Sequence, residues 1–411
     1  MDNSNFIYLA LGTNLGNRRE NLNNSIILLE TFGVKFIESS PIYKTPALLL
    51  EGSPLDWNKP YLNCVIKVQS NLLPEDLLSV CKKIEAQLGR DFSMKWAPRP
   101  IDIDILIYKN IKINTETLTI PHKAIFARYF LLDALSFLYP EYIKNINYYG
   151  KEHQATFMGI LNITPDSFSD GGLHNDKNNF IESFNMWEEE SINFIDIGAE
   201  STNPNSNPIN NEQELERLKF VFDFLKNKNF KYLKPKLSID TYHYETAEKA
   251  LMAGFDIIND VNALKDERML NLIKGTNKQY VLMHSLSVPP KKDLIIDNIN
   301  DIKIWLENKL NLIDKKNISK NQIIFDFGFG FGKNPYQCLK LIELIDEFYK
   351  YGVKILIGHS RKSMLKAFEN NIKTLDYETL AISLKLSNKI DIFRVHTPIE
   401  HQNALIAYKT V

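Results

Sequence analysis

Two aspartates, Asp102 and Asp104, stand two residues apart in the stretch Ala97-Pro-Arg-Pro-Ile-Asp-Ile-Asp-Ile-Leu-Ile107. On a strand both carboxylates face the same side, ~5–7 Å apart, and they repel by less than the about 4 kcal/mol expected at ~4 Å and an effective dielectric near 20. A solvated strand face would remove most of that cost. Against it, Arg99 lies just upstream, and the opposite face should be buried by Ile101, Ile103, Ile105 and Ile107. Mg²⁺ would offset the repulsion, and Mg²⁺ with arginine suits phosphoryl or pyrophosphoryl transfer.

Polar residues also follow eight short apolar segments in the rest of the chain. The segments are Phe157–Ile163, Phe194–Gly198, Leu237–Asp240, Asp256–Asp260, Tyr280–His284, Ile323–Phe327, Lys354–Gly358 and Ile392–His396. Seven end in or near a group able to do chemistry: Asn162, Asp196, Asp240, Asn259 with Asp260, His284, Asp326, and Arg394 with His396. The eighth, Lys354–Gly358, leads into His359-Ser-Arg-Lys362.

The eight segments are continuously apolar, as buried parallel strands are, and stretches with helical spacing separate them. Eight strand–helix units in roughly 250 residues predict a TIM barrel, whose active site lies at the C-terminal ends of the strands. Any one strand could end in Asp or Asn merely to cap a helix or start a turn. Repetition at eight ends, with Lys, Arg and His among the residues, favours a site.

The first third of the chain predicts a different domain. Its expected strands and helices are Phe6–Leu11, Asn17–Thr31, Val34–Tyr43, Tyr61–Gln69, Pro74–Leu88 and Ile101–Tyr108. This β-α-β-β-α-β order is that of an α+β ferredoxin-like sandwich. A helix at Tyr129–Leu138 and a polar stretch, Pro140–Gln154, follow. We therefore expect a domain over residues 1–140, a linker over 141–155 and an α/β barrel over 156–411.

Bulk composition sets limits on partners and location. The 411 residues are 44% hydrophobic and 24% charged with a formal net charge of -1, which argues against nucleic acid or an anionic membrane as partner. The three cysteines, Cys64, Cys81 and Cys338, form no pair motif, as is typical of a reducing compartment. Neither a secretory signal after Met1 nor an apolar run of membrane length occurs. We expect a cytoplasmic protein.

The first domain resembles 6-hydroxymethyl-7,8-dihydropterin pyrophosphokinases. The matching stretches are Leu11-Gly-Thr-Asn-Leu-Gly16, Tyr43-Lys-Thr-Pro46, Pro60-Tyr-Leu-Asn63, Glu85, Leu88-Gly-Arg90, Trp96-Ala-Pro-Arg-Pro-Ile-Asp-Ile-Asp104 and Ile120-Pro-His122. The resemblance implies that Asp102 and Asp104 hold two Mg²⁺ ions on the ATP phosphates while Arg90 and Arg99 neutralise the transferred pyrophosphate. It places the nucleotide near Glu85, Trp96, His122 and Arg128. It places the pterin against Thr45, Pro46, Leu48, Tyr61, Asn63 and Phe130.

The barrel resembles dihydropteroate synthases along nearly its whole length. The matching stretches are Met158–Gly172, Asp196–Thr202, Ser238–Thr241, Ile257–Asp260, Leu282–His284, Asp326–Lys333, Gly358–Ser363 and Arg394–His396. This resemblance implies that p-aminobenzoate displaces pyrophosphate from a pterin methyl pyrophosphate. Asn162 would bind Mg²⁺. Pterin contacts would come from Asp240, Asn259, Met283, Asp326 and Lys362, and pyrophosphate or aminobenzoate contacts from Asn162, Thr202, Ser363, Arg394 and His396. Asp240 would stabilise the cationic methylene, since a carboxylate facing developing positive charge binds the transition state preferentially.

Several departures and alternatives stay open. The loop after Arg90 offers only Lys95 where the pyrophosphokinases have further arginines. In the barrel, Asn203 stands where the synthases have arginine, and Phe327 where they have proline. The barrel could instead be a pterin-dependent methyltransferase domain, which the Thr164–Asp170 loop and Ser360-Arg-Lys362 disfavour. One domain could also be an inactive pterin-binding module. The resemblance further favours a homodimer through the outer barrel helices.

Overall fold

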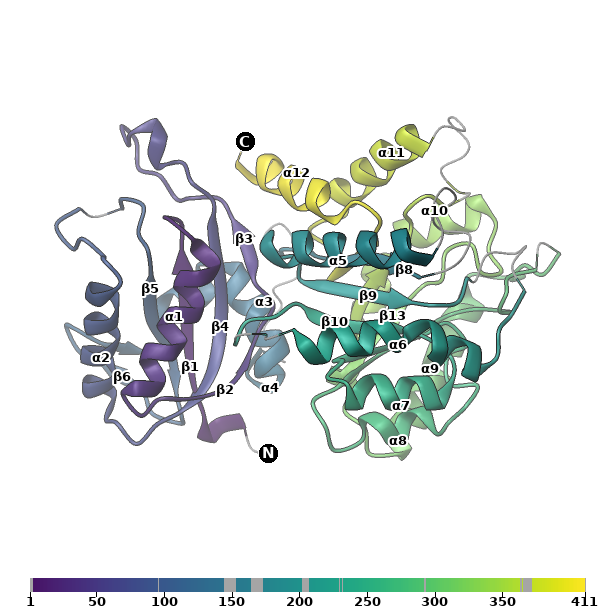
Figure 1. Cartoon of the computed structure of the whole chain (residues 1–411), viewed down its shortest axis with the longest axis horizontal. Coiled ribbons are helices and arrows are strands. Elements are labelled where there is room, and N and C mark those ends of the chain that lie inside the picture. The colour runs from purple at the N-terminus through teal and green to yellow at the C-terminus, as the bar shows by residue number, and fades with distance from the viewer. Residues whose placement is uncertain are drawn as a thin grey trace. The chain divides into compact units, whose positions relative to one another are not determined.

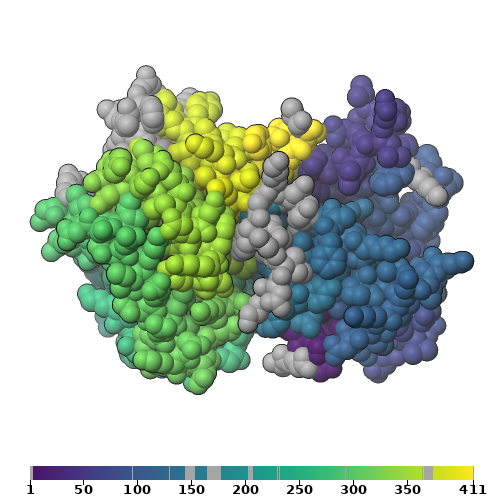
Figure 2. Space-filling model, turned by 180° about the vertical axis from the view of Figure 1, so that it is seen from behind, coloured from purple at the N-terminus to yellow at the C-terminus, as the bar shows by residue number. Residues whose placement is uncertain are grey.

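The computed structural model describes residues 3–94, 96–143, 153–163, 173–201, 207–228, 230, 232–291, 293–362, 364 and 372–410. The chain forms two compact units (Figure 1). The first comprises residues 1–154 with 230–234 and 402–411, and the second comprises residues 155–229 and 235–401. In the space-filling view, the green residues of the second unit form one continuous body (Figure 2). None of the described helices is long and apolar enough to cross a membrane.

The first unit is a sheet with helices on both faces. Its elements are β1 (Ile7–Thr13), α1 (Arg18–Thr31), β2 (Lys35–Ser39), β3 (Tyr43–Thr45), β4 (Tyr61–Gln69), α2 (Pro74–Gln87), β5 (Asp102–Tyr108), the short pair β6 (Ile113–Asn114) and β7 (Thr119–Ile120), α3 (Tyr129–Leu138) and α4 (Pro140–Ile143). Short 3-10 turns cover Asn3–Asn5, Leu55–Trp57 and Lys123–Phe126. The strands pair antiparallel in the order β2-β4-β1-β5, so the predicted ferredoxin-like sandwich is confirmed.

One local expectation for this unit was wrong. The single strand expected over Val34–Tyr43 is two strands, β2 and β3, because Pro41 between them lacks the N–H that a continuous ladder needs. The polar stretch from Pro140 begins with α4, whose Ile143 packs in the core of the first unit, and the bounds of the linker stay a prediction.

The two faces of the sheet bury different side chains. Leu9, Ile103 and Ile105 pack with α1 and α2, whereas Tyr8 and Leu106 pack with α3. Ile107 was expected beside Ile103 but lies on the α3 face, because the register between β1 and β5 shifts between Tyr8 and Leu9. A bulge of this kind turns the following side chains to the other face.

The second unit is a closed barrel of eight parallel strands, as predicted. Its strands are β8 (Thr156–Asn162), β9 (Phe194–Gly198), β10 (Lys236–Asp240), β11 (Ile257–Asp260), β12 (Gln279–Met283), β13 (Ile323–Asp326), β14 (Lys354–Ile357) and β15 (Ile392–Val395). Its helices are α5 (Leu173–Glu189), α6 (Asn211–Asn227), α7 (Tyr244–Met252), α8 (Met269–Ile273), α9 (Asn300–Lys315), α10 (Pro335–Glu343) and α11 (Ile372–Lys385), with 3-10 turns at Lys320–Gln322 and Ile345–Tyr351. Helix α12 (Pro398–Thr410) begins in this unit, and its residues from 402 onward belong to the first.

Local sequence signals set the starts of two barrel helices. Asn210 and Asn334 each form a capping box with the glutamine three residues later, so α6 and α10 begin where their first free N–H groups are satisfied. Figure 1 shows helices α5, α6 and α7 outside the strands. Because all eight strands run the same way, their C-terminal ends meet at one rim, which is where the sequence places the polar residues.

Candidate active sites

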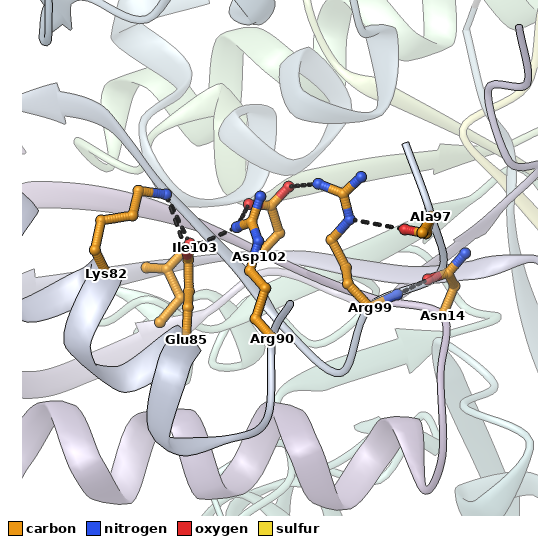
Figure 3. Close-up of polar contacts among 8 residues, drawn as sticks. All are labelled: Asn14, Lys82, Glu85, Arg90, Ala97, Arg99, Asp102 and Ile103. Carbon is orange, nitrogen blue, oxygen red and sulfur yellow. Dashed lines mark hydrogen bonds and ion pairs between the residues drawn. The ribbon is translucent and has the colours of Figure 1, made fainter. Parts of the chain in front are cut away.

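Arg90 and Arg99 hold the carboxylate of Asp102 from both sides in the first unit (Figure 3). Arg90 Nη1 lies 2.5 Å from Asp102 Oδ1, and Arg99 Nη1 lies 3.3 Å from Oδ2. Arg90 follows the end of α2, and Arg99 precedes β5, so two separate loops bring their guanidinium groups to one carboxylate. Three predicted residues thus form one charged cluster.

Glu85 on α2 supports this cluster from inside the protein. Its side chain is fully buried and its carboxylate lies 2.7 Å from Arg90 Nη1. It also accepts the backbone N–H of Ile103 at 2.8 Å and lies 2.9 Å from Lys82 Nζ (Figure 3). Burial raises the pKa of Glu85, and Lys82 and Arg90 oppose that rise. Glu85, predicted near the nucleotide, therefore contacts Arg90 and the start of β5.

Asp104 lies on the same face of β5 as Asp102. Burial and the neighbouring Asp102 charge raise the pKa of Asp104, while His122, Lys82 and Arg128 lower it. A divalent cation would remove this like-charge penalty. Among the described residues no three His, Cys, Asp or Glu side chains gather as a metal site. Two carboxylates nonetheless suit Mg²⁺, which commonly takes one or two carboxylates and completes its shell with water and substrate phosphates.

The predicted pterin residues line the neighbouring strands. Asn63 Nδ2 donates to Thr45 Oγ1 at 2.8 Å, and Tyr61 pairs with Thr45 across β3 and β4. Gly12 lies between Asn63 and Asp102 in the sheet, and a Cβ there would stand 2.7 Å from Asn63 Oδ1. Glycine thus keeps this part of the sheet face open.

The remaining first-domain residues are less closely gathered. Pro46, Arg128 and Phe130 are half-buried, and His122 caps the turn at Lys123–Phe126 through Nδ1. Leu48 and Trp96, at 67% and 44% exposed, lie on the surface and not among the packed site residues. Sequence reasoning assigned no role to Asn14, which accepts the Arg99 N–H at 2.8 Å (Figure 3). Its place within the Leu11–Gly16 motif was the available signal.

In the barrel, Arg394 joins two strand-end carboxylates. Arg394 Nε donates to Asp196 Oδ2 and Nη2 donates to Asp240 Oδ2, both at 2.6 Å. Asn259 Nδ2 donates to the same Asp196 oxygen at 3.1 Å. Burial raises the pKa of Asp240 to about 7, which Arg394 opposes and Asp196 reinforces. Four residues from β9, β10, β11 and β15 are therefore in direct contact.

Asp326 and Lys362 belong to the same electrostatic group. Burial raises the pKa of Asp326 and lowers that of Lys362, and each influences the other. The Gly328 N–H donates to Asp326 Oδ1 at 2.8 Å. Gly328 has φ +63, and a Cβ there would stand 2.0 Å from the His284 carbonyl oxygen, so only glycine fits this turn.

Three further predicted residues border this group. Gly198 lies between Asn162 Oδ1 and Asp240 Cβ, each 3.2 Å from the position of a Cβ. His396 Nδ1 lies 2.9 Å from Ser360 Oγ, and burial with Arg361 and Arg394 lowers its pKa to about 3. Met283 packs with Phe331, whose ring lies 4.8 Å from Lys362 Nζ.

Other strand-end groups have structural partners. Asp260 accepts the N–H groups of Asn262 and Leu264 and the hydroxyl of Tyr280. Arg361 forms a two-pronged pair with Asp376 on α11.

His284 lies 2.8 Å from the buried Lys333 Nζ, a residue that sequence reasoning left without a role. The predicted residues Thr202 and Ser363, the Thr164–Gly172 loop and the departures at Lys95 and Asn203 lie outside the described residues.

Comparison with known proteins assigns both halves. Residues 8–140 match the family model for 7,8-dihydro-6-hydroxymethylpterin-pyrophosphokinase, and residues 158–396 match that for pterin binding enzymes. The "Folate synthesis bifunctional protein" of Chlamydia muridarum is 36% identical over 98% of this chain and 97% of its own. An Arabidopsis thaliana protein of the same name is 31% identical over 97% and 94%.

A solved structure supports the barrel assignment. Dihydropteroate synthase from Anaplasma phagocytophilum, with bound 6-hydroxymethylpterin-monophosphate, is 32% identical with a TM-score of 0.56 and covers 62% of this chain and 98% of its own. The fold and these family matches thus define a two-domain transferase that acts on pterins. The chain belongs to the family of bifunctional folate-synthesis enzymes, with a hydroxymethyldihydropterin pyrophosphokinase domain followed by a dihydropteroate synthase barrel.

Proposed function

We propose that residues 1–140 carry the pyrophosphokinase site, residues 156–411 the synthase site, and residues 141–155 the linker. The first site would transfer the terminal pyrophosphate of ATP to 6-hydroxymethyl-7,8-dihydropterin and release AMP. The second would join the product to p-aminobenzoate, releasing pyrophosphate and forming 7,8-dihydropteroate. The observation that carries the second assignment is the meeting of Asp240, Asp326, Lys362 and Arg394 at one barrel rim.

In the first site, the pterin hydroxyl oxygen attacks the β-phosphorus of ATP, the bond to the AMP oxygen breaks, and the hydroxyl proton is lost. Arg90 and Arg99 lie against Asp102, where they would face the charge that develops on the transferred group. Asp102 and Asp104 would hold Mg²⁺, which supplies charge neutralisation on the ATP phosphates. Trp96, His122 and Arg128 would contact the nucleotide, and Glu85 would hold Arg90 in place.

Thr45, Pro46, Leu48, Tyr61, Asn63 and Phe130 would receive the pterin in this first site. The Asn63–Thr45 hydrogen bond orients the Asn63 amide, leaving its oxygen over Gly12 to accept from the heterocycle. Leu48 is on the surface, so its contact would form only when the loop around it covers the ligand.

In the barrel, the arylamine nitrogen attacks the pterin methylene carbon, the carbon–oxygen bond to pyrophosphate breaks, and the amine loses a proton. Asp240 would stabilise positive charge on the methylene. Asp326, Asn259 and Lys362 would bond the ring edge, and Met283 would pack on the ring. The burial of Asp326 and Lys362, and the influence of each charge on the pKa of the other, support this assignment.

The leaving pyrophosphate would meet Asn162, Arg394 and His396, with Asn162 also holding Mg²⁺ through its amide oxygen. Because its pKa is low, His396 is neutral near pH 7, so it would act as a hydrogen-bond donor and not as a cation. If Ser360 donates to Nδ1, the proton sits on Nε2, ready for an anion. Thr202 and Ser363 would contact aminobenzoate or pyrophosphate.

Two wider expectations belong to the same proposal. Three free, buried cysteines support a reducing, cytoplasmic location. A homodimer through the outer barrel helices stays a prediction that gel filtration with light scattering would test.

A one-pot assay tests the whole proposal. The intact chain is incubated with 6-hydroxymethyl-7,8-dihydropterin, ATP, Mg²⁺ and p-aminobenzoate, and AMP and dihydropteroate are measured. Formation of both supports two active sites. AMP without dihydropteroate would make the barrel an inactive pterin-binding module, and omission of Mg²⁺ should stop AMP formation.

A further inference from the structure

Asp196 at the third position of β9 is fully buried, and its known partners are site residues. Its Oδ2 accepts hydrogen bonds from Arg394 Nε at 2.6 Å and from Asn259 Nδ2 at 3.1 Å. Its Oδ1 is buried and has no hydrogen-bond partner among the described residues. A buried carboxylate must be compensated, and here Arg394 and Asn259 supply the compensation.

The contact with Asn259 has a directional consequence. An ionised carboxylate only accepts hydrogen bonds, whereas an amide has one end that donates and one that accepts. Asp196 therefore requires the Nδ2 end of Asn259 and excludes its Oδ1 end, since turning the amide would place two acceptors together. Asn259 is itself buried, so its side chain has little room for a third orientation.

Asp196 also holds the guanidinium of Arg394, through its Nε, which Asp240 does not contact. Arg394 gives Nε to Asp196 and Nη2 to Asp240, so the plane of its guanidinium is held at two points. A guanidinium held in this way keeps Asp240 in one position, which a lysine at 394 could not do.

We infer that Asp196 is a positioning residue of the condensation site: it turns the Asn259 amide so that Oδ1 faces the substrate. The barrel would thereby select a heterocycle whose edge offers an N–H donor at that point and disfavour one that offers an acceptor. This inference rests on the proposed function, in which Asn259 contacts the pterin.

Removing the acceptor at position 196 tests the positioning role. In Asp196→Leu nothing holds Asn259 Nδ2, so the amide at 259 can turn either way, and the Michaelis constant for the pterin pyrophosphate should rise by ~10- to 100-fold, the range expected when a buried polar group loses its fixed partner. Asn259→Asp sets two acceptors against each other and should lose at least as much.

The conservative variant Asp196→Asn should keep most of the function. Arg394 Nε and Asn259 Nδ2 donate to the same oxygen of Asp196, so the amide introduced there can place its oxygen toward both donors and its nitrogen at the Oδ1 position. We expect a Michaelis constant within ~5-fold of the original, because both hydrogen bonds are retained. An Asp196→Asn variant as poor as Asp196→Leu would overturn the inference, since the charge of Asp196, and not its acceptor oxygen, would then be the cause.

Asp260→Leu is the matched control. Asp260 is another buried strand-end aspartate, but its carboxylate serves the turn at Asn262 and Leu264 and the hydroxyl of Tyr280. This change should lower the unfolding temperature without altering the Michaelis constant. AMP formation by the same chain and the thermal unfolding of every variant report folding.

Each outcome has one meaning. An unchanged Michaelis constant in Asp196→Leu overturns the positioning role while leaving the proposed reaction intact. Failure of the unaltered chain to make dihydropteroate overturns the proposed reaction itself. If Asp196→Leu does not fold, Asn259→Asp, which keeps Asp196, still decides: an unaltered Michaelis constant in that variant refutes the inference.

Discussion

Replacing the buried Glu85 by glutamine should lower the activity of the pyrophosphokinase site by displacing Arg90. Glu85 is buried and holds Arg90 Nη1 at 2.7 Å, Lys82 Nζ at 2.9 Å and the Ile103 N–H at 2.8 Å. Glutamine can still accept from Ile103 and Lys82 through an oxygen at the Oε1 position, but its amide nitrogen then faces the Arg90 donor at the Oε2 position. Because two donors then meet, the Arg90 charge is held by Asp102 alone.

The structure gives the size of the effect. Removing one partner of a buried ion pair costs about 3–5 kcal/mol, and because the Arg90 side chain is 15% exposed we take the lower end, about 3 kcal/mol. For a unit of this size that is a fall in unfolding temperature of roughly 6–12 °C. Misplacing Arg90 should also lower the turnover number for AMP formation by ~100-fold.

Lys82→Met is the matched control because it removes another partner of the same carboxylate. The Lys82 side chain is 42% exposed, and pairs at the surface contribute about 0–1 kcal/mol. Differential scanning calorimetry and an AMP assay should therefore show a small change for Lys82→Met and a large one for Glu85→Gln. Equal effects, or a neutral Glu85→Gln, would refute the argument that Glu85 positions Arg90.

Four further changes test the two sites. Asp104→Ala should abolish AMP formation but leave condensation from pre-made pterin pyrophosphate intact; loss of both would show that the sites are not independent. Asp240→Asn should lower the condensation rate at least ~100-fold with little change in pterin binding by calorimetry, and an unaltered rate would remove Asp240 from the mechanism. Because burial raises the pKa of Asp240 to about 7, its carboxylate is protonated at lower pH, so condensation should slow as pH falls through 7; a flat rate profile from pH ~5.5 to ~8.5 would contradict this. Lys333→Met leaves His284 and three carbonyls without their donor and should lower the unfolding temperature of the barrel, which Lys333→Arg should partly restore.

Strand positions were predictable because local patterns determine them. The continuously apolar segments of the barrel and the spacing of Asp102 and Asp104 depend only on side-chain period, which a sequence displays directly. The sequence of β5 alone does not predict the bulge that moves Ile107 to the α3 face. The bulge arises from the way β5 pairs with β1. The break between β2 and β3, by contrast, has a local signal in Pro41, which cannot donate to a ladder.

Pairing between strand ends could not be read from the sequence. Residue type and place suggested that Arg394 binds anions, but the structure joins it to Asp196 and Asp240, far away in sequence. Nothing local distinguishes Asp196, which contacts the site, from Asp260, which supports a turn. Both lie in buried strands, and only the surrounding residues decide what each carboxylate meets.

The charges at the barrel rim bear on how an anion could bind there. Asp196, Asp240 and Asp326 face Arg394 and Lys362, so these five groups carry more negative than positive charge when all are ionised. Arg394 is already committed to two carboxylates, and burial lowers the pKa of Lys362, which weakens its hold on a proton. A pyrophosphate brought to this rim therefore needs additional positive charge, which favours a divalent cation near Asn162 over binding by arginine alone.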